Sequence, residues 1–177
     1  MRVGRSIGHR RRLTAAAVAA ACDHVGMGEE PPRPVVAVGL VARDREGRLL
    51  LVKRANPPAR GRWSLPGGRV EAGETIAAAA ARELGEETGL EADVGEVAGV
   101  VERIGEGHHY LIVDLWAELA DGKVPVAGGD AADARLVGLE ELPGYPLSPG
   151  LAGFLAGIGC WPEGAPVPDD LADPPPR

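Results

Sequence analysis

The spacing of apolar and polar residues predicts a chain that alternates strands with helices. Residues 35–42 (VVAVGLVA) are apolar and rich in β-branched side chains, which is typical of a buried strand. The polar, glycine-containing segment 44–47 predicts a turn, and the apolar run at 48–54 predicts a second strand after it. By the same reasoning we expect further strands over 94–103, 109–119 and 135–139.

One long helix is expected near the middle of the chain, from about Thr75 to Thr88. Thr75 is a suitable N-cap, the alanine-rich sequence after it favours a helix, and Gly89 is typical of a helix end. The Gly- and Asp-rich residues 126–134 predict a loop, and residues 149–158 predict a second, shorter helix. Together these elements indicate a mixed α/β domain.

Both ends of the chain differ in composition from this central part. Residues 1–34 are basic and then Pro-rich, and residues 160–177 are Pro-rich, so we expect two disordered appendages around a domain of residues 35–159. The arginines and alanines of residues 1–26 resemble a secretory signal, and translation from Met27 is an alternative. The apolar run there is weak and no disulfide framework follows it, which favours a cytoplasmic location.

Charge and composition narrow the classes of function. The 177 residues carry a net charge of −7; five arginines and one aspartate give residues 1–26 a charge of +4, which leaves −11 on the remainder. An acidic body argues against binding of a nucleic-acid polymer, which needs a basic surface, but it suits a divalent cation. Two cysteines cannot form a four-ligand zinc site, and no apolar run is long enough to predict a membrane span.

Three glutamates of the predicted helix are the first candidates for a specific chemical role, the binding of a metal ion. Glu83, Glu86 and Glu87 are spaced three and four residues apart, so they share one helical face. Carboxylate oxygens are the ligands that Mg²⁺ prefers, although an acidic face taken alone is often merely solvated. Arg82 points to an adjacent face, where it can pair with Glu74 before the helix.

The residues around these glutamates favour a metal site over a merely solvated acidic face. From Gly68 to Leu90 the chain reads G-x5-E-x7-R-E-L-x-E-E-x-G-L, with Trp63-Ser64-Leu65-Pro66-Gly67 in front of it. This run resembles the Nudix box of the Nudix hydrolase family at every position of the motif. The resemblance extends over about residues 35–158 and leaves out both ends of the chain.

The resemblance implies a fold, a cofactor and a set of roles. The fold would be an α/β/α sandwich with a mixed sheet, in which the box forms a loop-helix-loop. Members hydrolyse a nucleoside diphosphate linked to another moiety, with water activated by Mg²⁺ or alternatively Mn²⁺. The resemblance assigns metal-ligand roles to the Gly67 carbonyl and the carboxylates of Glu83, Glu86 and Glu87, with Glu83 as the general base in part of the family. Gly68, Glu74, Arg82 and Gly89 would be structural residues of the motif.

Residues outside the box are weaker candidates. Arg54 and Arg62 are suited to substrate phosphates, and Asp133 is a candidate for substrate binding, although each can equally be an ordinary solvated residue. Some family members take their general base from a loop carboxylate. The candidates for that role are Asp130, Asp133, Glu102 and Glu106. Trp63 and Tyr110 are candidates to stack on a base or to belong to the core.

The box does not specify the substrate, because it contacts only the diphosphate and the metal. The flanking pattern is similar to bacterial ADP-ribose pyrophosphatase-like members, so ADP-ribose or another nucleotide sugar is the first expectation. The alternatives are a MutT-type enzyme acting on oxidised dGTP and a non-catalytic Nudix module that senses a nucleotide. In each case the partner would be a small nucleotide, without a membrane or a nucleic-acid polymer; a homodimer is a further expectation, because family enzymes are often dimers.

Overall fold

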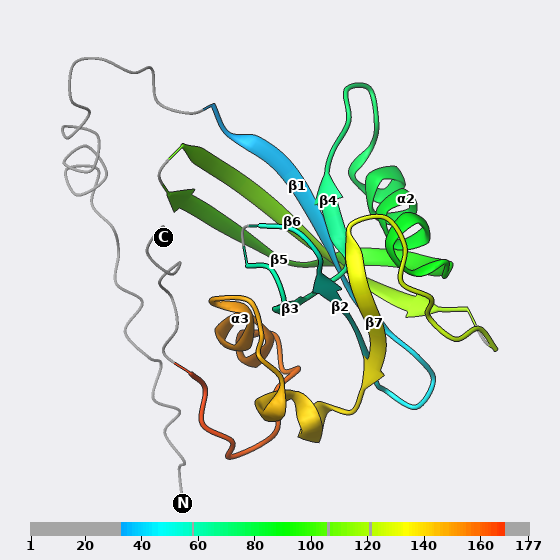
Figure 1. Ribbon diagram of the computed structural model, residues 1–177, viewed down its shortest axis with the longest axis vertical. Coiled ribbons are helices and arrows are strands. Elements are labelled where there is room, and N and C mark those ends of the chain that lie inside the picture. The colour runs from blue at the N-terminus through cyan, green and yellow to red at the C-terminus, as the bar shows by residue number, and fades with distance from the viewer. Residues whose placement is uncertain (1–32, 58, 106, 121, 169–177) are drawn as a thin grey trace, which may run out of the picture. The chain divides into compact units, whose positions relative to one another are not determined.

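The computed structural model describes residues 33–57, 59–105, 107–120 and 122–168, which form strands, two α-helices and one 3₁₀ turn (Figure 1). The strands are β1 (Val35–Arg43), β2 (Leu49–Arg54), β3 (Trp63–Ser64), β4 (Gly67–Arg69), β5 (Ala92–Gly105), β6 (His108–Leu119) and β7 (Ala131–Val137). The helices are α2 (Ile76–Thr88) and α3 (Leu151–Gly157), and the 3₁₀ turn η1 spans Leu139–Gly144. Within these ranges no helix is long and apolar enough to cross a membrane.

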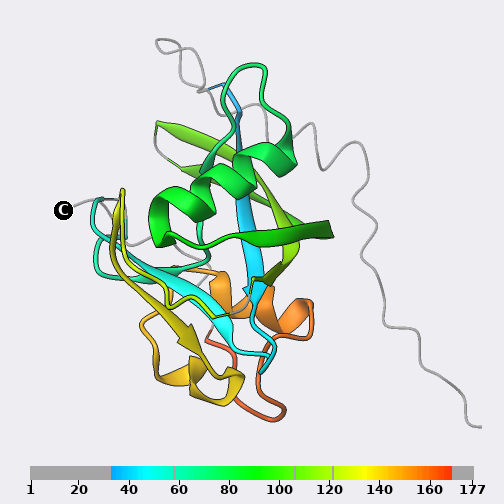
Figure 2. The same cartoon turned by 90° about the vertical axis from the view of Figure 1, so that its right-hand side faces the viewer.

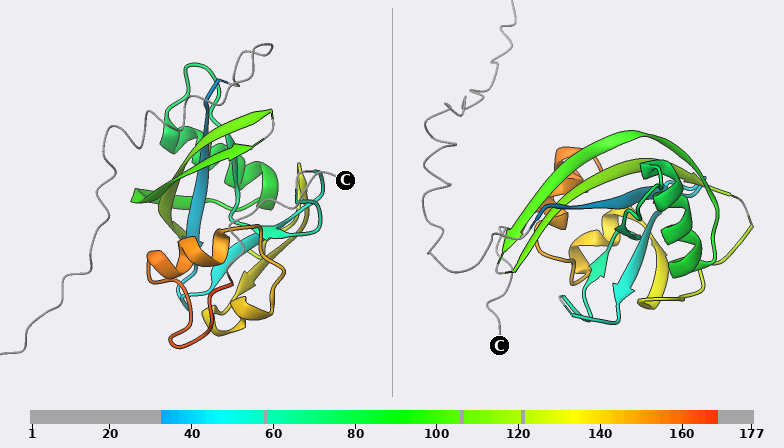
Figure 3. Two further views of the ribbon diagram at one scale, coloured as in Figure 1. Left: turned by 90° about the vertical axis from the view of Figure 1, so that its left-hand side faces the viewer. Right: turned by 90° about the horizontal axis from the view of Figure 1, so that it is seen from above.

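The strands form one mixed sheet in the order β3-β2-β1-β6-β5, as the α/β prediction requires. β1 pairs in parallel with β6 along its whole length, and the other pairings are antiparallel. The opposite edge of β1 is shared by two strands. β4 pairs with residues 37–39 of that edge, and β2 begins to pair at Arg43. β5 and β6 form a long curved hairpin (Figure 3).

Two apolar clusters cover the two faces of this sheet. Because side chains alternate along a strand, Leu40 of β1 faces one cluster and Val41 faces the other. The first cluster contains Leu84 of α2, which runs across β1 in Figure 2. The second contains Leu155 of α3. The two helices therefore pack against opposite faces of the sheet, in the order of layers expected for an α/β/α sandwich.

Three features of the fold differ from the expectations. β3 and β4 were not predicted, because a strand of two or three residues is too short to show an alternation of apolar and polar side chains. Both strands are held only by pairing with strands that are distant in the sequence. β7 begins at Ala131 inside the predicted loop, because residues 131–137 pair with β2. Cys160 was expected in a disordered tail, but it is fully buried in the cluster around α3. Residues 1–32 and 169–177 lie outside the described ranges.

Candidate active site

The ends of α2 are fixed by its own sequence. The Thr75 side chain accepts a hydrogen bond from the Ala78 amide (3.1 Å) and caps the first turn. Gly89 adopts φ 66°, a left-handed conformation that glycine tolerates, and its amide bonds to the Gly85 carbonyl (2.9 Å). Between these caps, Leu84 is buried against the sheet, so the residues on either side of it are turned towards β4 and solvent.

A hydrogen bond from a backbone amide to a carboxylate joins the glycine loop to this helix. The Gly67 amide donates to Glu87 Oε2 over 2.9 Å. Gly67 itself is paired with Gly39 of β1, and a Cβ on Gly67 would lie 2.1 Å from the Val38 carbonyl oxygen. Only glycine fits this close approach of two strands. The loop and the helix are therefore held at a fixed separation by the central strand of the sheet.

Glu87 is the most perturbed carboxyl group of the helix. Burial raises its pKa to about 7, and the nearby charges of Glu83 and Asp130 act in the same direction. The hydrogen bond from Gly67 and the positive charge of Arg54 oppose this shift. The geometry thus places several negative groups around one partly buried carboxylate, an arrangement that a cation would stabilise.

Arg82 organises the remaining carboxylates. Its guanidinium donates to both carboxylate oxygens of Glu74, each at 3.0 Å, and to Glu83 Oε1 at 2.9 Å. It also reaches Glu86 Oε2 at 3.3 Å and the Arg69 carbonyl of β4 at 3.1 Å. These contacts raise the pKa of Arg82 and lower that of Glu74, chiefly through their mutual hydrogen bonds. The ion pair expected between Arg82 and Glu74 is present and ties the glycine loop to α2.

The donor set fits a hard divalent cation in its chemistry. Carboxylate oxygens and the Gly67 carbonyl are the ligands that such ions prefer. No group of three His, Cys, Asp or Glu side chains in the described ranges is placed so as to hold one ion. This is compatible with Mg²⁺, which proteins usually bind through one or two carboxylates while waters and substrate phosphates complete the shell.

Replacing Arg82 by Lys tests its organising role. A lysine keeps the positive charge but cannot donate two parallel hydrogen bonds to Glu74 while also holding Glu83. We expect Arg82→Lys to lower turnover by about 10- to 100-fold, the usual cost of losing a group that orients metal ligands. Steady-state kinetics across a titration of divalent cation measures this. Unchanged kinetics would show that the network does not position the glutamates.

One cavity of about 710 Å³ connects this site with the face of the sheet that α3 covers. At one end lie Gly67 and the carboxylates of Glu83, Glu86 and Glu87; at the other lie Arg103, Asp114 and Ser148. Arg54 and Asp130 line the cavity near the glutamates, and the Asp130 carboxylate accepts a hydrogen bond from the side-chain amide of Asn56 (2.9 Å). The cavity has an acidic end formed by α2 and a separate end beyond β1.

A sequence profile of the NUDIX domain matches residues 33–157, which include the sheet, both helices and the acidic end of the cavity. The chain belongs to the Nudix family. It is 41% identical over 114 residues to an ADP-ribose pyrophosphatase of Methanocaldococcus jannaschii, covering 62% of this chain and 65% of that protein. It is 39% identical over 89 residues to a human (Homo sapiens) 8-oxo-dGDP phosphatase, covering 46% of this chain and 27% of that protein.

The solved structures similar to this chain include Nudix hydrolases. The crystal structure of a MutT NUDIX hydrolase from Burkholderia pseudomallei has a TM-score of 0.63 and 30% identity, with 70% of this chain and 97% of that chain covered. The chain therefore has the mixed-sheet fold of the Nudix family. It spans less than two thirds of the length of the two curated relatives named above.

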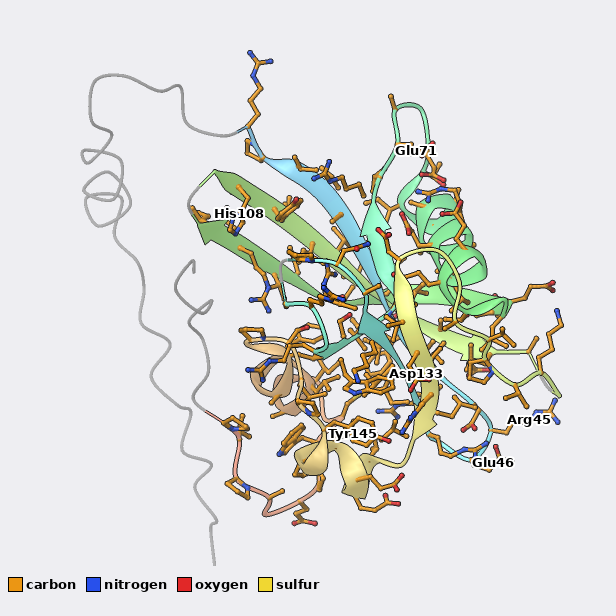
Figure 4. The ribbon with its side chains drawn as sticks, viewed as in Figure 1. Arg45, Glu46, Glu71, His108, Asp133 and Tyr145 are labelled. Atoms are coloured by element: carbon orange, nitrogen blue, oxygen red, sulfur yellow. The ribbon has the colours of Figure 1, made fainter. Side chains whose placement is uncertain are left out.

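Several residues predicted outside the Nudix box do not reach the cavity. Asp133 lies on β7 (Figure 4) and does not line the cavity; its carboxylate accepts a hydrogen bond from Arg135 Nε over 2.9 Å. Arg62 lies apart from the cavity and donates to the Leu147 carbonyl (3.4 Å). Glu102 is exposed and contacts His109 (2.8 Å), whereas Trp63 is buried in the core. Glu106 lies outside the described residues.

Arg54, Asp130 and Tyr110 are the outer candidates that line the Nudix cavity. The cavity residues that sequence reasoning missed include Arg103, Asp114 and Ser148. Asp114 could have been found, because it is a single charged residue within the apolar stretch LIVDLW of β6. A charge on a strand that is otherwise apolar indicates either a buried ion pair or a site.

Proposed function

We propose that this Nudix hydrolase cleaves the phosphoanhydride of a nucleoside diphosphate linked to another moiety, with Mg²⁺ or Mn²⁺ as cofactor. ADP-ribose is the first substrate that we propose, supported by the 41% identity to the archaeal ADP-ribose pyrophosphatase. The observation that carries the proposal is the continuous cavity, with carboxylates at one end and room beyond β1 for the nucleoside.

Different residues along this cavity would bind the cation, bind the phosphates and accept the proton. Glu86, Glu87 and the Gly67 carbonyl would hold the cation, which, when bound, neutralises phosphate charge and lowers the pKa of water. Arg54 is suited to a phosphate oxygen, because its charge lies close enough to Glu87 to lower the pKa of that carboxyl group. Glu83 and Asp130 line the cavity as the two candidates for the carboxylate that accepts a proton from the attacking water.

A second candidate substrate class is an oxidised deoxynucleoside triphosphate or diphosphate. The 39% identity to the human 8-oxo-dGDP phosphatase supports this alternative. A non-catalytic sensing module is disfavoured, because Glu83, Glu86 and Glu87 are all retained and gathered at the cavity.

Product analysis tests the proposed function. With Mg²⁺, ADP-ribose should yield AMP and ribose 5-phosphate, whereas an oxidised dGTP should yield the monophosphate and pyrophosphate. Ion-exchange chromatography separates these products. We expect EDTA to abolish turnover and added Mg²⁺ or Mn²⁺ to restore it. An enzyme that is inactive with both substrates, nucleotide sugars and dinucleotides in either metal would contradict the proposal.

A further inference from the structure

The far end of the cavity contains a carboxylate that the hydrolytic site does not use. Asp114 of β6 is 5% exposed and lines the cavity. Among the described residues, none donates a hydrogen bond to its side chain, and the positive charge that acts on it is that of Arg103. Burying a carboxylate without hydrogen bonds is costly, so a core position would ordinarily be filled by an apolar residue.

The sheet fixes where this carboxylate lies. Asp114 pairs with Gly39 of β1, and Gly39 in turn pairs with Gly67 of β4. A Cβ on Gly39 would lie 2.1 Å from Asp114 Oδ1, so the carboxylate occupies the space that glycine leaves open. The backbones of Asp114 and Gly67 therefore lie on opposite sides of Gly39, and the carboxylate leans over Gly39 from the β6 side.

The other polar groups at this end are also arranged around the cavity. Arg103 donates a hydrogen bond to the Pro149 carbonyl, and its guanidinium packs over Gly150. The Arg103 guanidinium therefore donates to the loop before α3 and not to Asp114. Ser148 lines the same cavity, and its buried hydroxyl has no hydrogen-bond partner among the described residues. Asp114 and Ser148 thus add two buried polar groups to this part of the cavity lining, and they are not hydrogen-bonded to one another.

We propose that Asp114 is a specificity-determining residue that accepts a hydrogen bond from the exocyclic amino group of the substrate's nucleobase. This inference rests on the proposed function, because it places the phosphates at the glutamates of α2 and the base beyond β1. It predicts a preference for amino-bearing bases over bases that carry only oxo groups.

The chemistry of the carboxylate explains the preference. An ionised carboxylate only accepts hydrogen bonds, so it pairs with an amino group and repels an oxo oxygen. Burial raises the pKa of Asp114 to about 6 and Arg103 opposes the shift, so the group is ionised at pH 8. A polar site that loses its matching partner on the ligand rejects the altered ligand strongly.

Calorimetric titration of the full chain with AMP, GMP and IMP, in Mg²⁺ at pH 8, tests the inference. IMP differs from AMP and GMP in lacking an amino group. We expect AMP or GMP to bind about 10- to 100-fold more tightly than IMP. Equal affinity for all three ligands, or no measurable binding of any of them, would overturn the proposal.

Asp114→Asn separates recognition from a structural role. The amide offers both a donor and an acceptor, so it can pair with an amino or an oxo group, and we expect the preference to fall to about threefold or less. Glu118→Gln is the matched control, since Glu118 lies on the same strand but is exposed and outside the cavity. A preference retained in Asp114→Asn would contradict the assignment, even if the wild-type chain discriminates.

Hydrolysis assays keep this inference distinct from the proposed function. Turnover of ADP-ribose and of its hypoxanthine analogue at equal rates would leave the hydrolase proposal intact and remove the role of Asp114. Discrimination in the binding experiment without any turnover would support Asp114 and remove the hydrolase proposal.

Discussion

Replacing both Glu86 and Glu87 by Gln is expected to lower turnover by at least about 10³-fold. The two carboxylates flank the Gly67 loop at the acidic end of the cavity, and Glu87 accepts the loop's amide hydrogen bond. Amides keep the shape and the acceptor oxygen but remove the charge that holds a divalent cation. Several kcal/mol of transition-state stabilisation would go with the cation. Steady-state kinetics with ADP-ribose measures the loss.

Stability measurements distinguish this chemical effect from unfolding. In the metal-free protein the pKa of Glu87 is raised from 4.5 to about 7, so its ionisation costs stability as the pH rises through that range. At pH 8 the double variant should therefore unfold at a urea concentration no lower than that of the wild type. Glu91→Gln, an exposed change just after the box, should alter neither property. A double variant with wild-type turnover would refute the site assignment.

Gly67→Ala is expected to have the largest effect on stability. Gly67 has φ 152°, and an added Cβ would lie 2.1 Å from the Val38 carbonyl oxygen and 2.8 Å from Gly39 Cα. Both atoms belong to the backbone of the central strand, so neither can move without opening the β1–β4 pairing. We expect a loss of about 2–4 kcal/mol in the free energy of unfolding, together with loss of turnover. Urea denaturation followed by circular dichroism measures the first effect.

Gly68→Ala provides the matched comparison. There the added Cβ would lie 2.3 Å from the carboxylate of Glu83, which is the flexible end of a side chain. We expect Gly68→Ala to displace Glu83 and lower turnover, while the free energy of unfolding changes much less than in Gly67→Ala. If the two variants lost equal stability, the close packing of Gly67 on β1 would not be the cause.

The box helix and its glutamates could be predicted because their determinants are local. Thr75 and Gly89 cap the helix, and three- and four-residue spacing is enough to place the glutamates on one face. β3 and β4 could not be predicted, because their pairing partners lie far away along the chain. Local sequence specifies the helix, whereas strand pairing within the sheet determines which residues lie opposite the helix.

The difference between local sequence and long-range sheet pairing also explains why Asp130 and Asp133 have different positions. Both belong to one Gly- and Asp-rich segment, which reads as a single loop. In the structure β7 begins between them, so Asp130 stays at the cavity and Asp133 bonds to Arg135 on the strand. Asp114 shows a different limit of sequence-based prediction. Its charge is visible in the sequence, but the cavity that it faces is formed by residues from several distant segments.

The shared edge of β1 also bears on how substrate preference can diverge among related enzymes. β4 pairs with one half of that edge, next to the glutamates, while Asn56, Pro57, Ala59, Ser148 and Pro149 line the cavity from loops that make no part of the box. Substitutions, insertions or deletions in these loops can reshape the nucleoside end while the hydrolytic end is inherited unchanged. Related enzymes can in this way share one catalytic unit and differ in the nucleotide that they accept.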